Sequence, residues 1–218
     1  KPVIGAGGHV AWLGIPRANG DIGGVYTWAP ATGVVAVTEQ SDRSTSASSF
    51  RTANVAINDT GRVAWVVTRR RDSAAGAFVW DPDTRLPRRL AAVGDLVEGH
   101  QLTRFGRFVG IDAQGTVVFL GSFGGNAHLV RAAGGVLTSL ATVEGGDFPG
   151  RLPDSGRVVW VAAGELRSYD GQVGSVVTRG DRTPVGAAIV PSTPSVNDAG
   201  AVAFVVTHEA LLRLADGV

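Results

Sequence analysis

The sequence contains no cysteine, no methionine and no long apolar run. Without cysteine, the 218-residue chain can form neither disulfides nor thiolate sites. No apolar stretch approaches the roughly 20 residues that a helix needs to cross a bilayer, so we expect no membrane span. Methionine is missing even at position 1, and we therefore expect either a fragment or, as the favoured interpretation, a mature exported chain without its signal peptide.

Charge is scarce as well. Charged residues make up 18% of the chain and the formal net charge is +1, which argues against a general nucleic-acid binder or a protein of acidic membrane surfaces. Hydrophobic residues make up 44%, which is typical of a globular domain rather than a disordered one. No window combines a helical period with capping residues, so we expect an all-β fold.

A single motif, present five times, dominates the rest of the sequence. Each copy can be aligned on a glycine, with an aliphatic residue four positions before it, a valine two positions after it and an aromatic residue four positions after it. A joint match at so many positions indicates a repeat architecture. The glycines are Gly8, Gly61, Gly115, Gly156 and Gly200, and the aromatic residues are Trp12, Trp65, Phe119, Trp160 and Phe204.

The residues around each glycine predict a tight turn followed by a buried strand. In the copy at 58–61, the Asn and Asp side chains can bond the backbone ahead of them, and the glycine accepts a positive φ. The strand after the turn is apolar at odd and even positions alike, so both of its faces must be covered. Sheets stacked radially, as the blades of a propeller are, provide that cover.

The spacing of the copies matches a four-stranded blade. Successive glycines are 41 residues apart at the closest (Gly115 to Gly156) and 54 at the widest (Gly61 to Gly115), near the roughly 40 to 50 residues of such a blade. We therefore predict one β-propeller domain of four-stranded antiparallel blades over 1–218, with repeats at about 1–52, 53–107, 108–148, 149–192 and 193–218. The fifth repeat stops where its fourth strand should begin. Either the array continues, or a partner strand completes the edge at 209–218 and allows self-association.

The motif resembles two known repeats. The pattern Asn-Asp-x-Gly-x-Val-Ala-Phe/Trp is similar to the tandem "NxxGxxAF" repeat of uncharacterised secreted bacterial proteins. The copy at 153–160, Pro-Asp-Ser-Gly-Arg-Val-Val-Trp, also resembles the "PDG" repeat of TolB-type propellers. The resemblance implies an extracytoplasmic β-propeller, and it implies no catalytic residue because the shared positions are turn and core positions.

The links between repeats carry Gly-Asp pairs whose carboxylates are candidate binding or catalytic groups. Asp95, Asp147 and Asp181 follow fourth strands and could gather at one rim, where a glycosidase would need two carboxylates about 5 to 10 Å apart. The simpler interpretation is that they only shape the links. Asp181 also ends an Arg-Gly-Asp tripeptide, which we attribute to the Gly-Asp position of the repeat. The turn aspartates, such as Asp59, are interpreted as turn residues rather than cation ligands.

Two tryptophans and two basic runs are further candidates for binding. Trp28 and Trp80 stand beside loops and could be half-exposed platforms for sugar stacking. Arg69, Arg70 and Arg71 form one basic run and 85–89 contains another, and together they could form a patch for an acidic partner or glycan. The alternative is that both runs are solvated loops.

Signatures of a metal centre or an activated nucleophile are missing from the sequence. The four histidines lack the spacing of a zinc site, and there is no Gly-x-Ser-x-Gly elbow, so we predict no metal, no cofactor and no catalytic residue. His9 follows a turn glycine and is expected to face solvent.

The expected function is therefore that of a non-catalytic scaffold outside the cell or on its surface, which binds a protein or glycan partner. One alternative is a propeller enzyme, a hydrolase or lyase acting on glycans. Another is a subunit of an extracellular filament or surface layer that a neighbouring chain completes. Specificity should lie in the long segments that vary between copies, namely 16–23, 40–51, 69–76 and 96–107.

Overall fold

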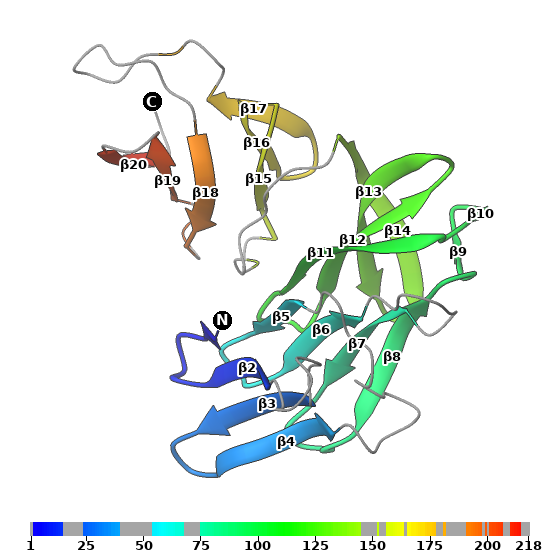
Figure 1. The fold of residues 1–218 in the computed structure, drawn as a ribbon, viewed down its shortest axis with the longest axis vertical. Helices are drawn as coiled ribbons and strands as arrows, with labels where there is room; N and C mark the ends of the chain where they lie inside the picture. Colours follow the sequence, from blue (N-terminus) through cyan, green and yellow to red (C-terminus); the bar gives the residue numbers. More distant parts are fainter. Residues whose placement is uncertain are drawn as a thin grey trace.

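The computed structural model is an all-β protein whose strands form successive antiparallel sheets (Figure 1). It describes residues 2–14, 24–39, 54–67, 75–144, 152, 156–163, 165–177, 181, 191–197, 199, 201–206 and 210–214. Across these residues no helix is long and apolar enough to span a bilayer.

The sheets are the predicted blades, and each is a meander in chain order. Blades one to three have four strands, and blades four and five have three strands among the described residues. Blade one comprises β1 (Val3–Ile4), β2 (Val10–Gly14), β3 (Gly24–Ala29) and β4 (Gly33–Glu39); blade two comprises β5 (Asn54–Ile57), β6 (Val63–Val67), β7 (Gly76–Trp80) and β8 (Pro87–Ala92); blade three comprises β11 (Arg104–Ile111), β12 (Val117–Phe123), β13 (Asn126–Ala133) and β14 (Val136–Val143); blade four comprises β15 (Val158–Ala162), β16 (Glu165–Tyr169) and β17 (Val173–Val177); blade five comprises β18 (Pro191–Val196), β19 (Val202–Val206) and β20 (Ala210–Leu214). The five blades follow one another around an arc, with blade one (blue) and blade five (orange to red) at its ends (Figure 1).

The second strand of a blade divides its side chains between two cores, as the apolar run predicts. In β6, Val63, Trp65 and Val67 pack in the core between blades one and two. Ala64 and Val66 point the other way, into the core between blades two and three. None of the five side chains is more than 2% exposed. The strand is therefore buried on both faces, because a sheet lies against each of them.

In blades two to five the aromatic residue of the motif faces the preceding blade. Phe119 packs in the core between blades two and three, Trp160 in the core between three and four, and Phe204 in the core between four and five. Each of them is at most 1% exposed. The prediction that these aromatic residues are core residues is confirmed for blades two to five.

The predicted turn at 58–61 is present, and its side chains also join neighbouring blades. Asn58 Oδ1 accepts a hydrogen bond from the backbone N–H of Arg62 at 2.9 Å, which closes the turn. Asn58 Nδ2 donates to the Asp112 carbonyl oxygen of blade three at 2.9 Å. Asp59 Oδ1 accepts from the backbone N–H of Ala6 in blade one. These turn residues therefore hold three blades in register, in addition to shaping their own turn.

The prediction of a long loop over 96–107 is wrong. A short hairpin, β9 (Leu96–Val97) and β10 (His100–Gln101), fills most of that segment, and β11 already begins at Arg104. Glu98 and Gly99 form its two-residue turn with φ values of 51° and 84°, the positive pair that such hairpins need. Val97 is fully buried in the core between blades two and three. The hairpin was missed because its turn carries glutamate where asparagine or aspartate is the usual signal.

Candidate functional site

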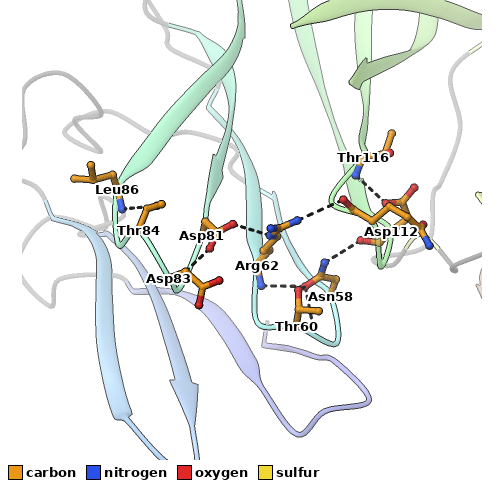
Figure 2. A network of polar contacts seen from close by, with 10 residues as sticks. Asn58, Thr60, Arg62, Asp81, Asp83, Thr84, Leu86, Asp112 and Thr116 are labelled. Carbon is orange, nitrogen blue, oxygen red and sulfur yellow. Dashed lines mark hydrogen bonds and ion pairs between the residues drawn. The ribbon is translucent and has the colours of Figure 1, made fainter. Parts of the chain in front are cut away.

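A cleft of about 620 Å³ lies between blades two and three, at the end of the sheets where the repeat turns lie. The turns β7–β8, β11–β12 and β13–β14 meet around it, because in a meander the first–second and third–fourth connections share one end of the sheet. Figure 2 shows a network of polar contacts that includes Arg62, Asp81, Thr84 and Thr116 from its lining. Its polar lining is Arg62, Asp81, Thr84, Arg88, Gln114 and Thr116, and its apolar lining includes Val79, Leu86, Pro87 and Ala133.

The Arg62 side chain lines the cleft and extends from Asp81 toward the turn of blade three (Figure 2). Its Nε lies 2.7 Å from Asp81 Oδ2, and its Nη1 lies 3.4 Å from the Gln114 carbonyl oxygen in blade three. Asp81 Oδ1 accepts a further hydrogen bond from the backbone N–H of Asp83 at 2.9 Å. Both carboxylate oxygens of Asp81 are therefore engaged inside blade two, and Arg62 bridges that blade to the next.

Glycine in the neighbouring turn makes room for this bridge. Gly115 has a φ of 84°, and a Cβ there would lie 2.7 Å from Arg62 Nη1. The same arrangement occurs one blade earlier, where the His9 ring lies over Gly61 and a Cβ would approach it to 3.0 Å. His9 is half-buried, so the expectation that it faces solvent is wrong. His9 follows the turn glycine of blade one and Arg62 follows that of blade two, and each side chain packs across the turn glycine of the next blade.

Arg88 and Arg89 are neighbours on β8 but point to opposite sides of blade two. Arg88 pairs with Val79, whose side chain faces blade three, whereas Arg89 pairs with Phe78, whose side chain faces blade one. Arg88 therefore lines the cleft. Both arginines are exposed, and within the described part of the chain neither forms an ion pair.

The predicted carboxylates lie away from this cleft or outside the described residues. Asp95 is exposed, and its Oδ2 accepts a hydrogen bond from the backbone N–H of Ala92 at 2.8 Å, so it shapes the link that follows β8. That link leaves the sheet at the end opposite the cleft. Asp181 is exposed. Asp147 lies outside the described residues, and so do Arg69, Arg70 and Arg71.

The two candidate tryptophans have different environments although they occupy equivalent positions. Trp28 pairs with Val10 in blade one, and Trp80 pairs with Val63 in blade two. Trp28 is 38% exposed, whereas Trp80 is 4% exposed and belongs to the core between blades one and two. The expectation that Trp80 is an exposed platform is therefore wrong, because blade one covers that side of blade two.

A second polar cluster, which the sequence did not reveal, lies on blade three. The Phe123 ring stacks on His128, with ring centroids 3.8 Å apart, and on its other neighbour His100, at 6.1 Å. His128 Nδ1 lies 3.1 Å from Ser139 Oγ. Burial lowers the pKa of His128, and a backbone hydrogen bond and the charge of Glu98 act in the opposite direction. The described residues contain no group of three or more His, Cys, Asp or Glu that could hold a metal ion.

Comparisons with known proteins address the fold. No protein-family model matches the chain, and no curated protein matches it. Among solved structures, TolB from Acinetobacter baumannii matches with a TM-score of 0.61 at 10% identity, over 94% of this chain and 49% of that one. A structure of a nidogen/laminin complex matches with a TM-score of 0.54 at 13% identity, over 91% of this chain and 67% of that one. A putative gluconolactonase matches with a TM-score of 0.53 at 11% identity, over 94% of this chain and 70% of that one.

These matches agree with the sheet topology, and the chain has a β-propeller fold. The chain spans about half the length of the TolB structure that it matches. At identities this low, the likeness concerns the fold alone, since one propeller scaffold serves many functions.

Proposed function

We propose that the chain is a non-catalytic binding module and that the cleft between blades two and three receives an acidic group of a protein or glycan partner. The observation that carries the proposal is the unequal engagement of the charged groups in the cleft. Asp81 is held by Arg62 at 2.7 Å, whereas Arg88 lines the same cleft without an ion-pair partner among the described residues. Among the described residues, the cleft therefore offers one positive charge that no carboxylate neutralises.

The chemistry of the lining favours recognition over catalysis. Acid–base catalysis in such a cleft usually needs a second titratable side chain beside the first. Among the lining residues Asp81 is the only carboxylate and there is no histidine, and Asp81 is itself held by Arg62 and by the Asp83 N–H. An arginine is a good partner for a carboxylate, because its fork of N–H donors can bind both oxygens at once. The apolar side chains of Leu86 and Pro87 beside it can cover the carbon skeleton of such a ligand.

An exported location belongs to this proposal. It rests on the resemblance of the motif to repeats of secreted bacterial proteins and of TolB-type propellers. In such a setting, acidic protein segments and uronic-acid glycans both supply the required carboxylate. The test below distinguishes these two classes.

Binding to two fluorescent probes tests the proposal directly. We would titrate the protein into fluorescein-labelled hexaglutamate and fluorescein-labelled trigalacturonate, and follow anisotropy at low and at high salt. We expect binding of at least one probe, weakened by salt. Arg88→Ala should weaken it by roughly 10- to 100-fold, because a hydrogen bond to a charged group contributes about 1.5 to 3 kcal/mol.

Arg89→Ala is the matched control, because it removes the same charge from the other side of the same strand. We expect it to change the affinity by less than about twofold. Failure of both probes to bind, or an equal loss of affinity in the two variants, would contradict a site in this cleft.

A further inference from the structure

The cleft and the β9–β10 hairpin lie at opposite ends of one interface, the interface between blades two and three. Val79 lines the cleft and Val97 belongs to the hairpin, and both side chains are part of the core between these blades. The hairpin follows β8 at the end of the sheet opposite the repeat turns, and it lies beside the outer strand β14 (Figure 1). A segment of the chain itself therefore fills one end of the interface, and the cleft is the other end.

The segment that fills the far end is an aliphatic residue followed by an acidic one. The Val97 side chain is fully buried. The next residue is Glu98, and its Oε1 accepts a hydrogen bond from the backbone N–H of Ser139 on β14 at 3.1 Å. The pair thus places apolar carbon in the interface and a carboxylate on a donor at its edge. This combination avoids burying an unpaired charge.

The cleft offers the same two kinds of contact. Leu86 on blade two is 69% exposed and Ala133 on blade three is exposed, so apolar carbon lines the cleft from both blades. Arg88 is exposed in the same cleft, with no ion pair among the described residues. A single exposed leucine would mean little, but this one stands in a cleft beside a guanidinium that can bind both oxygens of a carboxylate.

The lining suits a peptide better than a glycan. A sugar ring is bound through its hydroxyl groups, which need acceptors as well as donors, and through its apolar face, which an aromatic ring covers best. The described lining contains no aromatic ring, and Asp81, its only carboxylate, is already held by Arg62 at 2.7 Å. An aliphatic side chain needs only apolar neighbours, which Leu86 and Pro87 supply.

We propose that the cleft binds a peptide segment in which an aliphatic residue precedes an acidic one, as Val97 precedes Glu98 in the hairpin. The aliphatic side chain contacts Leu86 and Ala133, and the carboxylate binds Arg88. This inference rests on the proposed function, which it narrows from an acidic group of a protein or glycan to a peptide of this kind.

Three probes with equal charge test this choice. The first is a fluorescein-labelled, amidated peptide with three copies of Val-Glu-Gly, the sequence at 97–99. The second has three copies of Ser-Glu-Gly, and the third is fluorescein-labelled trigalacturonate, so each ligand carries three carboxylates. In anisotropy titrations with the chain 1–218, we expect the valine peptide to bind about 4- to 10-fold more tightly than the other two, because an open cleft buries only part of a valine side chain.

Two leucine variants locate the apolar contact. Leu86→Ser should remove most of the preference for the valine peptide and change the affinity for the serine peptide by less than about twofold. Leu96→Ser is the matched control, since Leu96 is 61% exposed but lies on β9, at the other end of the interface. It should change neither affinity. Circular dichroism would confirm that both variants are folded.

The outcomes separate this inference from the proposed function. If the serine peptide or trigalacturonate binds as tightly as the valine peptide, and Arg88→Ala weakens binding of all three, the inference is overturned while the proposed function stands. An equal loss of the preference in the two leucine variants would also overturn the inference. If no probe binds, the proposed function fails together with it.

Discussion

The buried Asn58 side chain joins the turn of blade two to blade three, and Asn58→Ala removes that joint. Its Oδ1 accepts hydrogen bonds from the backbone N–H groups of Thr60 at 3.1 Å and Arg62 at 2.9 Å, and from the Thr60 hydroxyl at 2.9 Å. Its Nδ2 donates to the Asp112 carbonyl oxygen at 2.9 Å. Asn58 is 3% exposed, so water cannot take over these bonds without opening the interface between the blades.

The loss of stability in Asn58→Ala depends on which hydrogen-bond partners of Asn58 stay buried without a replacement. Thr60 is exposed, so water can replace its lost partner at little cost. The Arg62 N–H is left unpaired at a part-buried site, which costs about 1 to 3 kcal/mol. The Asp112 carbonyl keeps the hydrogen bond from the Gly115 N–H at 3.0 Å, so the lost bond from Asn58 Nδ2 costs roughly a further 1 kcal/mol. We therefore expect Asn58→Ala to lower the free energy of unfolding by about 3 kcal/mol. For a domain of this size, that corresponds to a Tm lower by roughly 6 to 12 °C.

Urea unfolding followed by circular dichroism measures this loss. The matched control is Asn197→Ala, at the same turn position in blade five, where Oδ1 accepts the Ala201 N–H at 2.9 Å and the residue is exposed. We expect the control to lose about 1 kcal/mol. If Asn58→Ala costs no more than Asn197→Ala, the bond to Asp112 does not stabilise the blade interface.

Three further predictions concern the turns, the cleft and the cluster on blade three. Gly61→Ala should destabilise the fold more than Gly156→Ala. Both glycines have a positive φ, at which a side chain costs roughly 1 to 2 kcal/mol. At Gly61 the added Cβ would also lie 3.0 Å from the ring of His9. Equal losses in urea unfolding would show that the ring moves aside without cost. A double-mutant cycle on Arg62 and Asp81 should give a coupling of about 0.5 to 1 kcal/mol that shrinks in high salt, because both side chains are partly exposed; zero coupling at low salt would contradict the bridge. Burial lowers the pKa of His128, so the unfolded chain binds the proton more readily and stability should fall as the pH drops from about 7 to about 5. His128→Asn should flatten that part of the urea-midpoint profile, and an unchanged profile would assign the pH dependence to other groups.

The strands and turns of a blade could be predicted because their signals are local. The turn predicted at 58–61 connects β5 (Asn54–Ile57) to β6 (Val63–Val67), and β6 is the buried strand predicted after that turn. A turn side chain bonds backbone groups two to four residues ahead, and an apolar run spans only one strand, so neighbouring letters suffice. The hairpin β9–β10 escaped prediction because its turn residues, Glu98 and Gly99, carry a weaker version of the usual signal.

The cleft was only partly predictable. Its basic run, 85–89, stood out in the sequence, but the run does not say which arginine faces which blade. The register Val79 to Arg88 decides that, and it also separates Arg88 from Arg89. The bridge from Arg62 to Gln114 joins residues 52 apart in the chain, and no local pattern encodes such a contact.

The sequence by itself determined the blade, namely its turn glycines, its strands with two buried faces and the position of the aromatic residue in each of those strands. Tertiary structure alone decided which equivalent residues are exposed. Trp28 and Trp80 hold the same register position, yet one is 38% exposed and the other 4%. The physical reason is that burial depends on whether another sheet lies against that face, and a repeat sequence specifies the face without specifying its neighbour.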